Sequence, residues 1–254
     1  MNWSDKAIII STRKQGENSL LVSVLTENHG LHSGMVSSAK KYAAICQPCN
    51  FVHVSWNARL EEHLGFFTCE SLKDNAHIIM FDKLKLHAVN SICSLLSRVM
   101  QEREVNRQIY NMVNSLIENI ISDDNWLEEY VFFELHLLSE LGYGLDLDKC
   151  AVTGEKDSLY YVSPKTGRAV TKEIGEPYKD KLLRLPYFMN KHKNINGTLC
   201  RNNTSSNSDL MEIIDGISLT RYFFNKCVFS FDKRGVPTSC NRFVQKILES
   251  AENV

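Results

Sequence analysis

Residues 6–26, KAIIISTRKQGENSLLVSVLT, determine how the first third of the chain folds. They contain two runs rich in β-branched and aliphatic residues, 6–13 and 19–26, joined by a polar segment around Gly16. Residues of this kind favour strands, and glycine favours the turn between them. Three further runs of the same character follow, at residues 31–37, 50–57 and 65–71. Five short strands within 80 residues predict a small closed barrel of the five-stranded OB type, which leaves no sheet edge exposed.

The hydrophobic period changes after Phe81. Apolar residues then recur at intervals of three and four over three successive stretches, 86–100, 109–120 and 126–141. This spacing puts the apolar residues on one face of a helix, so it predicts three consecutive helices. Two more helices are expected near the end of the chain, at 210–230 and 237–251.

Two segments interrupt this helical region. Residues 145–178 are rich in turn formers, and we expect a small hairpin there from strands 159–162 and 168–171. Residues 190–209 consist mainly of Asn, Ser, Lys and Thr and predict a mobile linker, because little of this segment can be buried. The sequence therefore predicts an α+β protein with an OB-type barrel over residues 1–80 and a helical domain with a β-hairpin insert over residues 81–254.

The charge is balanced overall but uneven along the chain. Lys and Arg number 29 and Asp and Glu number 30, for a net charge of -1, so no global basic excess indicates a nucleic-acid partner. Residues 81–162 hold 7 basic and 14 acidic residues, whereas residues 163–246 hold 15 basic and 7 acidic ones. The C-terminal third could therefore bind a polyanion, although a solvated surface explains such a run equally well.

The sequence also indicates the cellular compartment of the protein. No apolar stretch approaches the roughly 20 residues that a membrane helix requires, and the first residues lack the pattern of a secretory signal. We therefore expect a cytoplasmic chain without a membrane partner, whose eight cysteines are reduced.

The known enzyme templates are missing from the sequence. It contains no Walker-type phosphate loop, no GxGxxG, no GxSxG and no HExxH. Cys46 and Cys49 form a CxxC pair, which leaves a thiol-redox enzyme as an alternative, although the pair lies in a β-rich stretch rather than at a helix N-terminus. Zinc would need a second ligand pair. We expect no enzyme activity, no metal and no cofactor.

One long stretch, residues 132–154 (FFELHLLSELGYGLDLDKCAVTG), resembles the signature of the RecO family of DNA repair and recombination mediators. Residues 16–19, 161–170 and 216–221 resemble further blocks of that family in the same order, so the likeness spans nearly the whole chain. The sequence is most similar to those of alphaproteobacterial members of the family. Some relatives hold zinc with CxxC pairs that begin at the position of Cys150, but here Thr153 replaces the second thiol.

The resemblance implies a partner set as well as a fold. It implies a bacterial, nucleoid-associated protein that binds single- and double-stranded DNA and anneals complementary strands. It also implies work with RecR, contact with the acidic C-terminal tail of single-stranded DNA-binding protein (SSB), and help in loading RecA. An adaptor that binds only proteins through its helices remains an alternative.

Candidate contact residues follow from charge, aromatic character and this resemblance. An OB groove follows the phosphate backbone with positive charge and stacks bases on rings. The candidate DNA-contacting residues of the barrel are Arg13, Lys14, Lys40, Lys41 and Arg59, with Tyr42 and Trp56 as stacking residues. The candidate residues for the partner tail are Lys179, Lys181, Arg184, Arg221, Lys226, Tyr222 and Phe223, with Leu183 and Leu185 as apolar walls. The basic C-terminal third could contribute more to DNA binding than the barrel.

Overall fold

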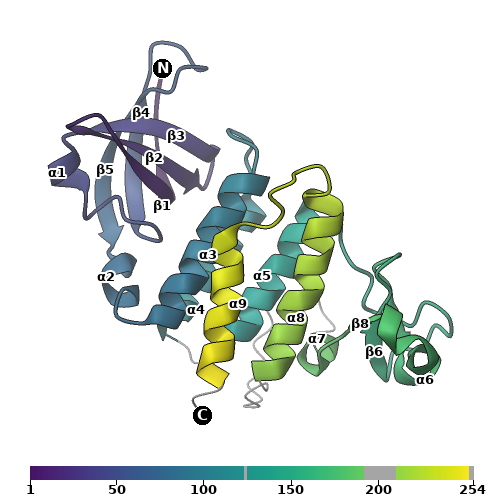
Figure 1. Ribbon diagram of the computed structural model, residues 1–254. Coiled ribbons are helices and arrows are strands. Elements are labelled where there is room, and N and C mark those ends of the chain that lie inside the picture. Colours follow the sequence, from purple (N-terminus) through teal and green to yellow (C-terminus); the bar gives the residue numbers. More distant parts are fainter. Residues whose placement is uncertain (123–124, 192–209, 252–254) are drawn as a thin grey trace. The chain divides into compact units, whose positions relative to one another are not determined.

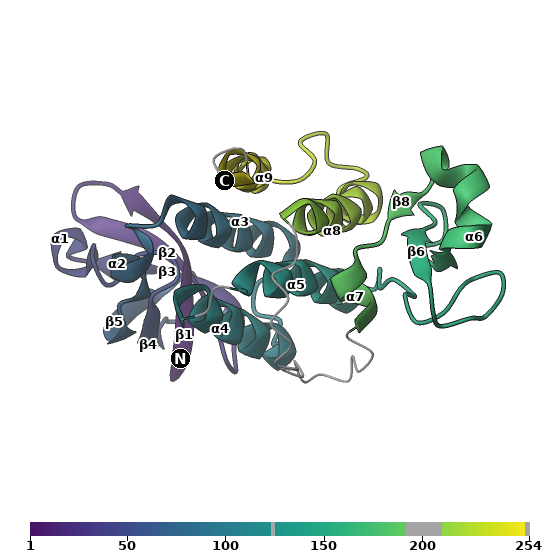
Figure 2. The same ribbon diagram turned by 90° about the horizontal axis from the view of Figure 1, so that it is seen from below.

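The computed structural model describes residues 1–122, 125–191 and 210–251. The chain divides into two compact units, which are described separately below. The first unit comprises Met1–Asp123 and Pro237–Phe243, and the second comprises Asp124–Val236 and Val244–Val254. Figures 1 and 2 show both units in two views.

The first unit begins with a closed five-stranded barrel, as the sequence predicts (Figure 1). Its strands are β1 (Asn2–Gln15), β2 (Ser19–Thr26), β3 (Gly30–Ser37), β4 (Phe51–Asn57) and β5 (Phe66–Lys73), in the order β1-β2-β3-β5-β4. Alternate residues point inward, so that Val22, Val24, Val52 and Val54 are fully buried in its core. A short parallel pairing between Met35 and Phe66 closes the ring.

Four complete helices and the helical residues 238–243 accompany the barrel among the described residues of the first unit. The complete helices are α1 (Ala39–Tyr42), α2 (Asn75–Ile79), α3 (Lys83–Val99) and α4 (Arg107–Ser122). The Asp82 carboxylate caps α3 by accepting the backbone N–H of Lys85 at 3.0 Å. The sequence predicted α3 and α4, whereas α1 and α2 are too short to produce a helical period.

The segment that links α3 to α4 lies against the barrel. The Arg103 backbone N–H donates to the Leu31 carbonyl at 2.7 Å, and its guanidinium donates to the carbonyls of Glu61 and His63. Gly30 permits this approach, because its φ is +68° and a Cβ there would lie 2.1 Å from the Glu104 carbonyl oxygen.

The second unit is built around the helices α5 (Trp126–Glu140) and α8 (Leu210–Phe223). They approach closely at Gly216, where an added Cβ would lie 2.9 Å from the Val131 side chain. After α8 the chain continues through a π-helical turn, η2 (Phe224–Val228), to α9 (Thr238–Ala251). This turn explains why the apolar pattern extends to residue 230 although the α-helix ends earlier.

The insert of the second unit forms a three-stranded sheet in the order β7-β6-β8. The predicted hairpin is present as β6 (Leu159–Val162) and β7 (Ala169–Thr171), and β8 (Leu183–Arg184) adds an edge that the sequence did not reveal. Three short helical segments flank the sheet: α6 (Lys172–Gly175), η1 (Glu176–Lys181) and α7 (Tyr187–Lys191). Most of the predicted linker, residues 192–209, lies outside the described residues. Among the residues that are described, no helix is long and apolar enough to cross a membrane.

Candidate nucleic-acid interface

Four predicted DNA-contacting bases lie at one end of the barrel wall. We call this set the basic rim, and it consists of Arg13, Lys14, Lys40 and Lys41. Strand pairing explains the grouping, because Lys14 pairs with Leu20 at the start of β2, and Leu20 pairs with Val36 at the end of β3. The chain enters α1 directly after β3. All four side chains are exposed, and none of them forms an ion pair with another described residue.

A short helix holds the two lysines of the rim. Ser38 takes a left-handed conformation with φ 63°, which turns the chain from β3 into α1. Ala39 is buried and donates its backbone N–H to the Asn18 carbonyl at 3.0 Å, so α1 is attached to the β1–β2 turn. The Tyr42 ring is half-buried against the barrel core, and the Lys41 ammonium lies 5.0 Å from its centroid. The lysines therefore project from an anchored helix.

Arg59 and Trp56 do not join this group. Arg59 is exposed in the loop between β4 and β5, next to Ala58, which donates its backbone N–H to the Met1 carbonyl at 3.0 Å. Figures 1 and 2 show that α1 and the N-terminus lie at separate places on the barrel. Trp56 is only 1% exposed and donates its indole N–H to the Leu64 carbonyl at 3.0 Å. The prediction that Trp56 stacks on a base is therefore wrong, because both faces of its ring are inside the protein.

Trp56 belongs to a buried aromatic cluster with Trp3, His32 and Phe67. The His32 ring lies edge-on to Trp56, with centroids 4.9 Å apart, and neither of its nitrogens has a hydrogen-bond partner among the described residues. Burial, together with the positive charge of Arg103, lowers the pKa of His32 to about 4. This histidine is neutral at pH 7 and contributes packing rather than charge.

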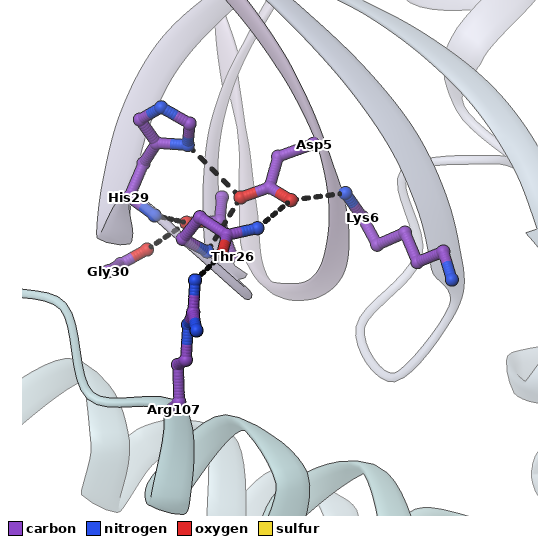
Figure 3. A network of polar contacts seen from close by, with 7 residues as sticks. Asp5, Lys6, Thr26, His29, Gly30 and Arg107 are labelled. Atoms are coloured by element: carbon purple, nitrogen blue, oxygen red, sulfur yellow. Dashed lines mark hydrogen bonds and ion pairs between the residues drawn. The ribbon is translucent and has the colours of Figure 1, made fainter.

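A polar network closes the β2–β3 end of the barrel, as Figure 3 shows. The buried Asp5 carboxylate accepts the Asn28 backbone N–H at 2.7 Å and lies 3.0 Å from Nδ1 of His29. The Arg107 guanidinium reaches from α4 to Oδ1 of Asn28 at 2.5 Å. Sequence reasoning missed Arg103 and Arg107 as barrel-fixing residues, because they lie beyond the barrel in the chain and no local pattern links them to it.

The CxxC pair is also inside the first unit. Cys46 and Cys49 are 0% and 2% exposed, and both are free thiols. Burial raises the pKa of Cys49, so its reactive thiolate form is disfavoured. The geometry therefore gives no support to the thiol-redox alternative.

In the second unit, two predicted tail-contacting residues are buried. Arg221 is 8% exposed and pairs with Glu134, which is fully buried, at 2.7 Å. The Tyr130 hydroxyl donates to the same carboxylate at 2.8 Å, and the Thr220 hydroxyl donates to its other oxygen at 2.5 Å. Phe223 is 3% exposed. The assignment of Arg221 and Phe223 to a surface pocket is wrong, since both side chains are buried.

The remaining predicted tail residues are distributed over several local contacts. Lys179 pairs with Glu176 at 3.4 Å, and Arg184 pairs with Asp215 at 3.1 Å. The other two bases, Lys181 and Lys226, and the ring of Tyr222 are exposed. Of the proposed apolar walls, Leu183 is partly exposed, whereas Leu185 is buried at 2% exposure and cannot line an open surface.

At the position where the zinc site is expected to be lost, Cys150 is buried and is followed by an exposed turn. Cys150 is 2% exposed, and its sulfur accepts the Thr171 backbone N–H at 3.5 Å. Burial opposes ionisation, but donors from Thr153, Thr171 and Val152 outweigh it and lower the pKa of Cys150 to about 6. In the part of the chain that is described, no group of three or more His, Cys, Asp or Glu residues is arranged to hold a metal ion.

Comparisons with known proteins cover the whole of this architecture. The family "Recombination protein O N terminal" matches residues 1–74, and "Recombination protein O C terminal" matches residues 80–217. The "DNA repair protein RecO" of Rickettsia canadensis is 41% identical over 232 residues, which is 90% of each chain. The proteins of the same description from Rickettsia akari and Orientia tsutsugamushi are 39% and 38% identical and cover 98% of this chain and 99% of their own length.

Proposed function

The chain belongs to the RecO family of non-enzymatic mediators of DNA repair and recombination, and from that membership we propose that it binds single- and double-stranded DNA through the basic rim of its barrel. In this proposal the rim bases contact phosphates and the half-buried ring of Tyr42 offers a stacking face. The protein acts in the bacterial cytoplasm, at the nucleoid.

The observation that carries the proposal is the state of the rim bases. The side chains of Lys40 and Lys41 are exposed, carry no acidic partner among the described residues, and project from a helix that is attached to the barrel. Unpaired bases attract phosphates, and each contact releases counterions from the nucleic acid. A fixed position for the bases reduces the conformational entropy that is lost on binding.

The partners follow from the same membership. The family implies DNA and RecR as partners. We further propose that this chain contacts the acidic tail of SSB and, with RecR, helps to load RecA onto SSB-covered strands. Lys179, Lys181, Arg184, Lys226 and Tyr222 stay candidates for the tail, because their side chains are exposed and four of the five are cationic. The domain limit between residues 80 and 81 also stays a proposal.

Fluorescence polarisation with a labelled single strand tests the function directly. The wild-type chain is expected to bind the strand and to anneal it to its complement without any nucleotide cofactor. The variant Lys40→Ala/Lys41→Ala should bind several-fold more weakly at a fixed salt concentration. A wild-type chain that binds neither strand nor duplex at low salt would overturn the proposal.

A further inference from the structure

Among the described residues, the most exposed aromatic ring lies in the second unit, close in the chain to Tyr222 and Lys226, two of the candidate tail residues. Phe231 is 101% exposed, in the loop between η2 and α9. Its neighbour two positions earlier, Phe229, is 6% exposed and stacks on Phe224 with ring centroids 6.3 Å apart. The loop therefore buries one phenylalanine and leaves the next one in water, although a buried aromatic side chain would stabilise the fold.

This loop is held at both ends. The Phe229 backbone N–H donates to the Phe224 carbonyl at 2.8 Å, and the Val236 backbone N–H donates to Oδ1 of Asn225 at 3.1 Å. Between these anchors, the Gly235 backbone N–H donates to the Asp232 carbonyl at 2.9 Å. Phe231 thus projects from a loop with a defined fold.

The chain next to the exposed ring is basic. Lys233 and Arg234 follow it in the loop, and both are exposed. Asp232 is the acidic residue of the loop and pairs with Arg234 at 3.1 Å. Within η2, the Lys226 ammonium donates to the carbonyls of Pro164 and Lys165.

These contacts join two segments at one end of α8. Asn225 holds the loop 229–236, and the adjacent Lys226 holds the turn that carries the exposed side chain of Lys165. Tyr222 is 39% exposed and lies four residues before Lys226, which is one helical turn. Two accessible rings and four exposed bases therefore lie on η2 or on segments next to it in the chain or hydrogen-bonded to it.

We propose that this surface, formed by Phe231, Lys233, Arg234, Lys226, Lys165 and Tyr222, is a second contact site for single-stranded nucleic acid. Phe231 stacks on a base, and the lysines contact the flanking phosphates. A base needs only one ring to stack on, whereas a protein-docking surface usually needs several apolar side chains in contact. The exposed bases that follow Phe231 in the same loop match a polyanion.

A second strand site adds to the proposed function, on which this inference rests. A protein that holds two strands at once can bring them together for annealing. The basic rim and the Phe231 surface belong to different units, so each unit can carry its own strand.

The variant Phe231→Trp tests the stacking contact in the full chain. None of the three natural tryptophans is fully exposed, and Trp56 and Trp126 are only 1% and 4% exposed. The new indole is therefore in water, where a nucleic-acid base can reach it and change its fluorescence. Its fluorescence is expected to be quenched by an oligothymidylate and not by an abasic strand of the same length. Phe81→Trp is the matched control, because Phe81 is another exposed phenylalanine at 77%, and its fluorescence should not change.

Affinity measurements separate stacking from charge. Phe231→Ala should weaken single-strand binding by roughly fivefold or more at fixed salt, with the salt dependence unchanged. Lys233→Ala should reduce the slope of log K against log salt by about 0.7.

Three results would count against the site. Unquenched fluorescence of Phe231→Trp, with a wild-type chain that binds the strand, overturns this site and leaves the rim in place. A Phe231→Ala variant that keeps its DNA affinity but binds RecR more weakly would identify a protein-docking surface instead. A wild-type chain that binds no strand overturns the proposed function and this site together.

Discussion

Lys40 and Arg221 are both bases in regions that the sequence marks as candidate binding surfaces, yet they have opposite environments. Lys40 stands on an anchored helix at the end of the barrel, exposed and without an acidic partner in the described chain. Arg221 lies inside the helices of the second unit, against the fully buried Glu134. A buried base whose charge is already neutralised within the fold cannot bind a polyanion, so the number of bases counted along the sequence overestimates how many bases the second unit offers to a ligand.

The interiors of the two units also differ in how they hold ionisable side chains. The barrel core encloses His32 in an aromatic cluster, where burial keeps the ring neutral. The second unit instead buries a complete ion pair whose carboxylate also accepts hydroxyl hydrogen bonds from Tyr130 and Thr220. A buried pair is not strong evidence of stability, but removing one partner leaves the other charge uncompensated.

The largest effect is expected from breaking that pair. Arg221→Met leaves the Glu134 carboxylate buried without its ion-pair partner. This change should lower the free energy of unfolding by about 3–5 kcal/mol, measured by urea denaturation. Lys233→Met, which changes an exposed base of the same unit, should stay within about 0.5 kcal/mol of wild type. The double variant Glu134→Leu/Arg221→Met should recover part of the loss. A single Arg221→Met variant as stable as wild type would show that the pair is not buried in solution.

A smaller effect is expected from acidifying the barrel core. The pKa of His32 is about 4 in the folded chain and 6.5 ordinarily, so the unfolded chain takes up its proton first as the pH falls. Its contribution to stability is complete above about pH 6.5 and is lost progressively towards pH 4, by roughly 3 kcal/mol in all. The measurement is urea denaturation of wild type and His32→Phe between these values. Between pH 6.5 and pH 4, wild type should lose roughly 3 kcal/mol of stability relative to His32→Phe, and parallel profiles would contradict the assignment.

A further test concerns the contact that fixes the barrel to the α3–α4 link. Gly30→Ala should cost about 2–3 kcal/mol, because its left-handed backbone is strained by a side chain and the new Cβ meets the Glu104 carbonyl. Gly16→Ala has nearly the same φ, +67°, with no heavy atom within 4 Å of its Cβ, and should cost only about 1 kcal/mol. Thermal unfolding of both variants isolates the steric part. Equal losses would mean that the link does not contact the barrel.

The elements that the sequence predicted well are those with a strong local period. All five barrel strands and the helices α3, α4 and α5 lie close to their predicted positions, because β-branched runs and apolar stripes are local signals. β8 was missed because it has two residues, and α1 because four residues show no period. The barrel order itself depends on the Met35–Phe66 closure, which no local pattern reports.

The exposure of the candidate site residues was predictable only where it follows from their position in the chain. Lys40 and Lys41 follow a strand in a polar segment and are exposed, as expected. Trp56 and Arg221 were assigned from residue type, but their burial depends on packing partners distant in the chain, such as Leu64 for the indole and Glu134 for the guanidinium. No sequence pattern predicted that Phe231 is exposed, since a phenylalanine in a loop usually packs against the rest of its own fold.

The central claim is that the rim lysines contact phosphates, and the salt dependence of single-strand binding tests it most directly. If Lys40 and Lys41 each meet a phosphate, Lys40→Ala/Lys41→Ala should reduce the slope of log K against log salt by roughly 1.4, at about 0.7 for each contact. The control Lys149→Ala/Lys156→Ala removes two other exposed bases and should keep the wild-type slope. A slope that is the same in wild type and in the Lys40→Ala/Lys41→Ala variant would remove the basic rim from the DNA interface.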